Sequence, residues 1–195
     1  MIDKKVRDVL KNYTVGIAGV GGLGSNCGVA LARIGIGRLV VADYDVVELS
    51  NLNRQYYFYD QIGMPKVEAF KDNIYKIDKQ IKVDAYKVKL SKENILSIYK
   101  DVNIMVEAFD KAEMKLMLIE EVLMNMSDKY IISGSGLAGW GNNDTITTKQ
   151  YDKLIICGDG ITEVNDDNPP LAPRVGIVAN MQANIVVELI MKGKI

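Results

Sequence analysis

Apolar residues follow two alternating patterns along most of the chain. Short continuous runs rich in Val, Ile and Leu are typical of strands buried on both faces of a sheet. They occur at residues 14–20, 38–43, 81–88, 103–109 and 129–136. Segments with helical spacing of apolar residues lie before and between them, at 3–11, 23–35, 65–77, 92–100 and 111–126. Strands that alternate with helices predict an α/β fold with a doubly wound, mainly parallel sheet covered on both faces.

The C-terminal part of the chain has a different pattern. Residues 143–150 and 151–157 alternate between polar and apolar, which predicts antiparallel strands added to the sheet. A loop follows at 158–174, and a closing helix is expected over 174–192. A loop of this length in a compact fold is more often functional than idle. Because no linker interrupts the chain, residues 1–195 are expected to form a single domain.

A glycine motif stands directly after the first expected strand. Gly19, Gly21 and Gly24 form G-x-G-x-x-G with Gly22 inside it, and Asp43 ends the second strand. In such a motif the glycines allow a sharp turn, and the N–H groups at the start of the following helix bind phosphate. The carboxylate accepts hydrogen bonds from the ribose hydroxyls. The motif therefore predicts a Rossmann-like nucleotide site, against the alternative of a tight turn without a ligand. The motif lacks the Gly-Lys-Ser/Thr ending of a P-loop.

A polar and basic string follows Asp43, and its spacing is informative. Its members are Asp43 and Asp45, then Ser50, Asn51, Leu52, Arg54 and Gln55, then Gly63, Pro65 and Lys66. Further on, VEAFDKAEMK contains Asp110, and APRVGIVANMQANIVVELI stands near the end. In these motifs the chain resembles the family of ThiF, MoeB and the ubiquitin-activating enzymes over nearly its whole length. The resemblance is closest to the short ThiF-like proteins of thiamine biosynthesis.

The resemblance implies an ATP-dependent adenylyltransferase. Its substrate would be the C-terminal Gly-Gly carboxylate of a ubiquitin-like sulfur-carrier protein, here a ThiS-like one on the route to the thiazole of thiamine. The resemblance implies that Arg54, Lys66 and Asp110 are catalytic and that Asp110 binds Mg²⁺. It implies these nucleotide contacts: Gly19, Gly21, Gly22, Gly24, Asp43, Asp45, Asn51, Arg54 and Lys66. It also implies a homodimer, and the loop from Glu163 to Pro173 could cross a bound carrier tail or be disordered without one.

The residues support this chemistry independently. Adenylation brings a carboxylate to the α-phosphate of ATP, so catalysis is mainly positioning and charge neutralisation. Arg54 has a planar guanidinium group and Lys66 a compact ammonium group, and both can bind phosphate oxygens. Asp110 follows a strand, at the edge of the sheet where such folds bind ligands. Three of the candidate residues also have a plainer interpretation: Arg54 as a solvated loop arginine, Asn51 as a turn residue, and Asp110 as a helix N-cap.

The chain departs from the family pattern in three places. Lys111 follows Asp110 where relatives usually have asparagine, which adds a positive charge beside the expected metal ligand. The two Cys-x-x-Cys pairs that hold zinc in many relatives are missing, so no zinc is expected. Larger relatives use an N-terminal arginine that often reaches the partner subunit. Arg7 is the only arginine upstream of the glycine motif, and its surroundings match the family poorly.

The composition of the chain excludes some catalytic groups and gives no support to some kinds of partner. The chain has 195 residues, a formal charge of -1 and no histidine, which excludes an imidazole base or metal ligand. The charge gives no reason to expect nucleic acid or a membrane as a partner, and the charged N-terminus suggests a cytoplasmic protein. Of the two cysteines, Cys27 is expected to pack inside. Cys157 is either a reactive thiol or, as free cysteines favour, a small buried hydrophobe.

Two rival functions remain open. A NAD(P)-dependent oxidoreductase would explain the stretch from Gly19 to Asp43 but would leave Arg54, Lys66 and Asp110 without a role. A catalytically silent nucleotide-binding scaffold would bind ATP without transferring the adenylyl group.

Overall fold

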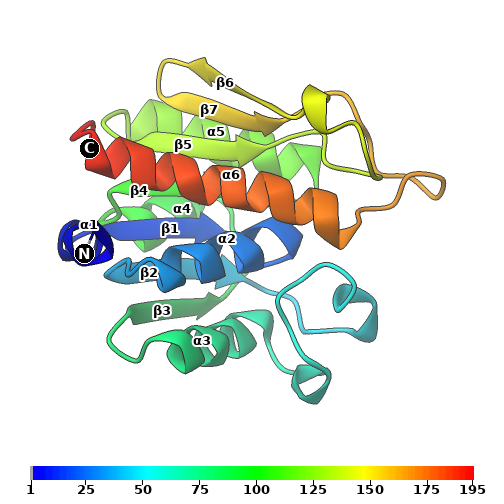
Figure 1. Cartoon of the computed structure of the whole chain (residues 1–195), viewed down its shortest axis with the longest axis horizontal. Helices are drawn as coiled ribbons and strands as arrows, with labels where there is room; N and C mark the ends of the chain where they lie inside the picture. Colours follow the sequence, from blue (N-terminus) through cyan, green and yellow to red (C-terminus); the bar gives the residue numbers. More distant parts are fainter. Residues whose placement is uncertain (1) are drawn as a thin grey trace.

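The computed structural model describes residues 2–195 and contains one seven-stranded sheet with helices on both faces (Figure 1). The strand order is β3-β2-β1-β4-β5-β7-β6. The strands are β1 (Thr14–Ala18), β2 (Arg38–Asp43), β3 (Lys82–Lys87), β4 (Ile104–Glu107), β5 (Tyr130–Gly134), β6 (Thr147–Tyr151) and β7 (Leu154–Gly158). All neighbouring pairs are parallel except β6 and β7, which pair antiparallel. The prediction of a mainly parallel sheet with antiparallel strands near the C-terminal end is confirmed.

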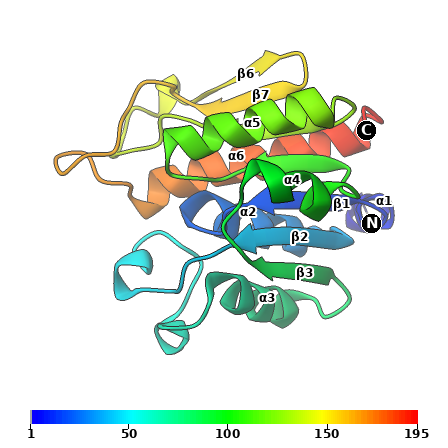
Figure 2. The same cartoon turned by 180° about the vertical axis from the view of Figure 1, so that it is seen from behind.

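The helices divide between the two faces of the sheet. They are α1 (Ile2–Leu10), α2 (Gly22–Arg33), α3 (Lys66–Ile77), α4 (Lys92–Tyr99), α5 (Ala112–Asn125) and α6 (Ala172–Met191). Residues of α1, α2, α3 and α6 share one apolar cluster with the sheet, while α4 and α5 share the other (Figures 1 and 2). The chain is therefore doubly wound, as the alternation of runs predicts.

The continuous apolar runs arise because both faces of the sheet are covered. In β2, Leu39 and Val41 belong to the cluster under α2, α3 and α6. Val40 and Ala42, the residues between them, belong to the cluster under α4 and α5. Successive side chains of a strand point to opposite faces, so a strand buried on both faces needs apolar residues at every position.

Most predicted boundaries differ from the observed ones by one to four residues, and the strand predicted at 151–157 begins only at Leu154. Four further differences have a plain local cause or bear on the site. The first strand ends at Ala18 rather than at residue 20, because the glycine turn begins there. Residues 143–145 form a short 3₁₀ helix, and β6 begins only at Thr147. The last helix begins at Ala172, with Pro173 in its first turn, where proline is tolerated. The third predicted helix begins at Lys66, with Pro65 as its N-cap.

The long helix α6 belongs to the core of the fold. Among the residues that the structure describes, it alone is long and apolar enough to cross a membrane by length and composition. More than half of that stretch is buried, however, and Val178, Ala179 and Val186 are fully covered against the sheet and α2. Its apolar character is therefore accounted for by packing.

The loops that could form a site leave one edge of the sheet. The carboxyl ends of β1, β2, β4, β5 and β7 all lie there, and the segments after β2 and β7 project on that side of the molecule (Figure 1). The chain order reverses between β1 and β4, which are neighbours in the sheet. In open α/β sheets a ligand binds outside the carboxyl ends at such a switch point.

Two helical glycines test how tightly α2 packs on α3. A β-carbon at Gly28 of α2 would lie 2.4 Å from Cζ of the buried Phe70, whereas one at Gly176 of α6 would meet nothing within 4 Å. We expect Gly28→Ala to lower the free energy of unfolding by about 1 kcal/mol or more, because overpacking outweighs helix propensity. Gly176→Ala should raise it by up to about 1 kcal/mol.

Urea unfolding of both variants followed by circular dichroism measures these changes. Equal effects of the two substitutions would contradict the close approach of α2 and α3.

Candidate functional site

A tight glycine turn joins β1 to α2. Gly19 has a φ of 87°, and a β-carbon at Gly24 would lie 1.9 Å from the Gly19 carbonyl oxygen. Both positions therefore require glycine. The helix starts at Gly22 with Gly21 as its N-cap, and no side chain caps it and no acidic residue occupies its first turn. Its first N–H groups are thus available to an anion.

The carboxylate of Asp43 fixes this turn to the loop after β2. It accepts the N–H of Val20 and the N–H of Asp45, each at 2.9 Å. The hydroxyl of Tyr57 donates to the Val20 carbonyl at 2.6 Å. Burial, together with the nearby carboxylates of Asp43 and Asp45, raises the pKa of Tyr57 well above its ordinary value, so this donor stays protonated.

Two polar residues of α2 hold the next segment in place. Ser25 donates to the Gly21 carbonyl at 2.6 Å and accepts the Tyr56 N–H at 2.9 Å. Asn26 donates to the Arg54 carbonyl at 2.9 Å. The first turn of α2 therefore sets the position of the segment that carries Arg54.

A cavity of about 410 Å³ opens beside this turn at the carboxyl edge of the sheet. The residues that line it come from the loop after β2, the start of α3 and the turn after β4. They are Tyr44, Asp45, Val46, Glu48, Asn51, Arg54, Gln55, Lys66 and Asp110. Five of the predicted site residues thus share one cavity: Asp45, Asn51, Arg54, Lys66 and Asp110.

The two predicted cations reach the cavity in different ways. Lys66 is 7% exposed, and its Nζ lies 2.8 Å from Oδ2 of Asp45. Arg54 is half-buried, and its side chain passes close to the glycine turn. Its Cγ lies 3.8 Å from the place that a β-carbon would take at Gly22. Its Nη1 donates to the Ser50 carbonyl and to Oδ1 of Asn53. These bonds leave other guanidinium donors available to a ligand.

Asp110 is exposed at the mouth of the cavity, in the turn between β4 and α5. The N-cap of α5 is Lys111, and no side chain caps that helix end. The plainer interpretation of Asp110, as the N-cap of this helix, is therefore wrong. Asp110 is instead one of the residues that line the cavity.

A buried carboxylate, which no sequence motif singles out, supports the turn that carries Asp110. Glu107 is fully buried at the end of β4. Its Oε1 accepts the Phe109 N–H at 2.6 Å, and its Oε2 accepts the Ser133 hydroxyl at 2.5 Å. Nζ of Lys115, in the first turns of α5, lies 3.0 Å from both oxygens. A buried charge needs such partners, and these ones fix the turn.

Two amide side chains complete the cavity wall. Oδ1 of Asn51 accepts the Glu48 N–H at 3.1 Å, so the turn role expected for Asn51 is real and its amide nitrogen can still donate. Gln55 is 9% exposed, and its Oε1 has no hydrogen-bond partner in the described structure. An unpaired buried acceptor is costly, which favours a donor from a ligand or water here. Gln55 stood in the sequence motif but was not selected from it.

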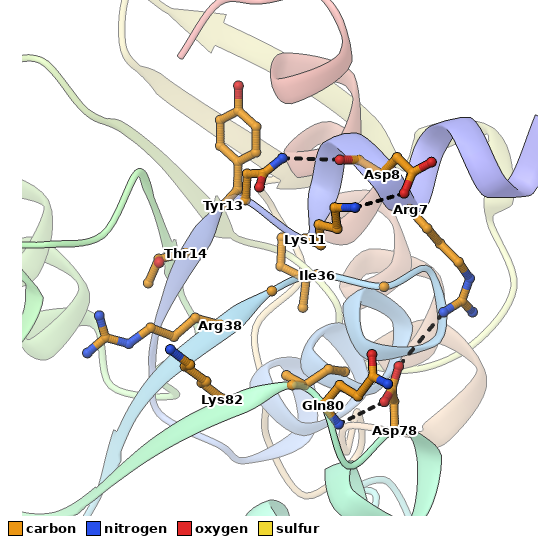
Figure 3. Close-up of a pocket in the computed structure, with 14 residues that line it drawn as sticks. Arg7, Asp8, Lys11, Tyr13, Thr14, Ile36, Arg38, Asp78, Gln80 and Lys82 are labelled. Carbon is orange, nitrogen blue, oxygen red and sulfur yellow. Dashed lines mark hydrogen bonds and ion pairs between the residues drawn. The ribbon is translucent and has the colours of Figure 1, made fainter.

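A larger cavity of about 620 Å³ lies at the opposite edge of the sheet, where the strands begin (Figure 3). Arg7 lines it, donates to the Arg33 carbonyl at 2.6 Å and lies 3.9 Å from Asp78. Lys11 pairs with Asp8 there at 2.9 Å. Arg7 is thus remote from the carboxyl-edge cavity of its own chain, and a role in a partner subunit stays a prediction.

Both cysteines are buried. Cys27 and Cys157 are each 0% exposed. Burial raises the pKa of Cys157 to about 12, despite a hydrogen bond with Thr148 that favours the thiolate. Burial raises the pKa of Cys27 still further. Of the two interpretations of Cys157, the structure favours the small buried hydrophobe.

Residues 1–194 match the ThiF family. The adenylyltransferase and sulfurtransferase MOCS3 of Dictyostelium discoideum is 29% identical over 193 residues, which cover 95% of this chain and 44% of that protein. The adenylyltransferase and sulfurtransferase UBA4 of Kluyveromyces lactis is 38% identical over 130 residues, 66% of this chain and 29% of that protein. The chain therefore spans less than half the length of these curated relatives.

Solved structures have the same fold. The tRNA N6-threonylcarbamoyladenosine dehydratase TcdA of E. coli, in complex with ATP, superposes with a TM-score of 0.87 at 18% identity. The match covers 98% of this chain and 90% of that one. E. coli MccB with ATP superposes with a TM-score of 0.72 at 27% identity, over 96% of this chain and 58% of that one.

The buried cysteines generate a direct test. At pH 8 a thiol with a pKa of about 12 is almost wholly protonated, and Cys157 is also inaccessible. We expect the folded protein to take up no iodoacetamide over an hour and the unfolded protein to take up two equivalents, as read by intact mass. Rapid labelling of Cys157 in the folded protein would reopen its role as a nucleophile.

Proposed function

This chain belongs to the ThiF family, and on that premise we propose that it is a magnesium- and ATP-dependent adenylyltransferase. Its substrate in this proposal is the C-terminal Gly-Gly carboxylate of a ubiquitin-like sulfur-carrier protein. We further propose a ThiS-like carrier, which would place the product on the route to the sulfur of thiamine's thiazole.

One observation carries the proposal. Arg54, Lys66 and Asp110 come from three separate elements and line one cavity beside the glycine turn. Two cations and a carboxylate that meet there suit a triphosphate with its metal ion. A nicotinamide-dependent oxidoreductase would need none of the three, so this convergence counts against that rival.

The nucleotide would lie across the switch point of the sheet. We assign its ribose to Asp43, whose two oxygens retain acceptor capacity beyond the bonds they already make. The phosphates would face the free N–H groups at the start of α2, next to Gly21 and Gly22. The unpaired Oε1 of Gln55, beside Gly21, offers an acceptor to a ligand hydroxyl or amine.

The chain's own groups would act on charge and position. The carrier carboxylate attacks the α-phosphorus of ATP, a bond forms to its oxygen, and pyrophosphate leaves. Arg54 would bind the nonbridging phosphate oxygens through its planar guanidinium group. Lys66, whose Nζ is positioned by the ion pair with Asp45, would neutralise the negative charge that develops in the transition state. Both groups lower the repulsion between two anions that must meet.

Asp110 would hold the magnesium ion. A magnesium ion held there would supply positive charge to neutralise part of the charge on the phosphate oxygens. In the described part of the chain no group of three or more acidic or thiol side chains could hold a metal ion. A single exposed carboxylate fits Mg²⁺, which keeps several waters and takes its other ligands from substrate phosphates.

Three substitutions test these roles. We expect Arg54→Ala, Lys66→Ala and Asp110→Ala each to lower the carrier-dependent exchange of pyrophosphate into ATP by about 10²-fold or more, the scale of one lost transition-state contact. The assay uses a purified ThiS-type carrier that ends in Gly-Gly.

Lys11→Ala is the matched control, because Lys11 pairs with Asp8 at 2.9 Å at the far edge of the sheet. It should leave the exchange unchanged. Near-normal exchange in all three site variants would refute the roles. ATP binding by the wild type without any carrier-dependent exchange would instead favour the silent scaffold.

A further inference from the structure

The side chain of Asp110 has no support of its own. Asp110 is exposed, and its carboxylate makes no hydrogen bond or ion pair with any described residue. Residues 108–111, which we call the turn segment, have no helix or strand structure, and no side chain caps the start of α5. The position of the Asp110 carboxylate therefore depends on what holds the backbone of the turn segment.

An ion pair joins the two ends of the turn segment. Glu107, which is fully buried, is the last residue of β4, and Lys115 lies near the start of α5. Nζ of Lys115 lies 3.0 Å from both carboxylate oxygens of Glu107. The Glu107–Lys115 pair thus closes a loop that has Asp110 near its middle, and it connects a strand to a helix that no side chain caps.

The Glu107–Lys115 pair is itself fixed to the sheet. The Ser133 hydroxyl donates to Oε2 of Glu107 at 2.5 Å, and Nζ of Lys115 also donates to the Gly134 carbonyl at 3.0 Å. Ser133 and Gly134 end β5, the strand next to β4. Because these partners lie on the sheet, the two charged groups have set positions and can hold the turn segment in one arrangement.

Glu107 also bonds the turn segment directly. Its Oε1 accepts the Phe109 N–H at 2.6 Å, one residue before Asp110. The carbonyl oxygen of Ala108 lies 3.1 Å from the place that a β-carbon would take at Gly19, so the turn segment also packs against the glycine turn. These contacts fix the backbone on the N-terminal side of Asp110, and the helix that carries Lys115 fixes it on the other side.

We propose that Glu107 and Lys115 are positioning residues, which set the affinity of the site for magnesium by fixing Asp110 at the cavity. The proposal rests on the proposed function, in which Asp110 holds Mg²⁺. A site with one protein carboxylate has no second protein ligand to correct a misplaced one, so its affinity depends on that placement. Replacing residues that hold a metal ligand in place commonly lowers metal affinity by about 10- to 100-fold.

The test measures how strongly Mg²⁺ tightens the binding of a fluorescent ATP analogue, titrated in EDTA and at a series of Mg²⁺ concentrations. We expect Lys115→Met to raise the Mg²⁺ concentration that gives half of this effect by about tenfold. The Kd for the analogue in EDTA should not change, because the pair acts on the metal ligand alone. Lys115→Arg keeps the cation and should lose much less affinity for Mg²⁺.

Lys129→Met is the matched control. The side chain of Lys129 is 13% exposed, close to the 21% of Lys115, and it pairs with Asp128 at 3.3 Å beyond the far end of α5. We expect this variant to keep the wild-type dependence on Mg²⁺.

A combined variant separates positioning from a contribution to stability. If Lys115 acts through Asp110, adding Lys115→Met to Asp110→Ala should change the Mg²⁺ dependence no further. A pair that only stabilises the fold would lower the midpoint of thermal unfolding and leave the Mg²⁺ dependence of the folded protein unchanged, which would overturn the proposal.

Lys115→Met leaves a buried carboxylate without its cation, which can prevent folding. Glu107→Gln/Lys115→Met then takes its place, because it removes both charges and keeps an amide oxygen for the Phe109 N–H. The same loss of about tenfold in Mg²⁺ affinity is expected.

The outcomes separate this proposal from the proposed function. Wild-type Mg²⁺ dependence in the folded Lys115 variants, with Asp110→Ala impaired, overturns the positioning role alone. Wild-type dependence in Asp110→Ala, or no effect of Mg²⁺ on the wild type, overturns the metal role of Asp110 and the positioning role with it. The expected losses in a protein without carrier-dependent exchange of pyrophosphate refute adenylation and leave the positioning role standing.

Discussion

The carboxylate of Asp43 ties together the two segments on which the site depends. It bonds the Val20 N–H of the glycine turn and the Asp45 N–H of the loop after β2. The loop that carries Arg54, and that leads into α3 with Lys66 at its start, is thereby set against the open end of α2. A residue that sequence motifs associate with ribose thus also has a structural role, and the carboxylate has enough acceptor capacity for both.

Much of this arrangement could be predicted from the sequence because it depends on local rules. Continuous apolar runs between helical segments specify a covered parallel sheet. Carboxyl ends of parallel strands share an edge, so Asp43, at the end of β2, and Asp110, after β4, were expected at the edge where the glycine turn lies. The motif spacing identified Arg54, in the loop between β2 and α3, and Lys66, at the start of α3, and the structure places both at that edge.

The remainder depends on contacts between segments far apart in the chain. Nothing local shows that Glu107, in a strand, would meet Lys115 and support the turn to Asp110. Nothing local shows that Arg174 would reach Asp159 and hold two loops at once. The identity of the α5 cap was likewise decided by the folded chain. These are tertiary effects, which override local preference.

The central claim is that Arg54, Lys66 and Asp110 act on one ATP molecule beside the glycine turn. A crystal structure with Mg²⁺ and a non-hydrolysable ATP analogue tests it most directly. The account predicts phosphate oxygens within hydrogen-bond distance of Arg54 and Lys66 and a metal ion on Asp110. A nucleotide bound at the opposite edge near Arg7, or one whose phosphates touch none of the three residues, would contradict it.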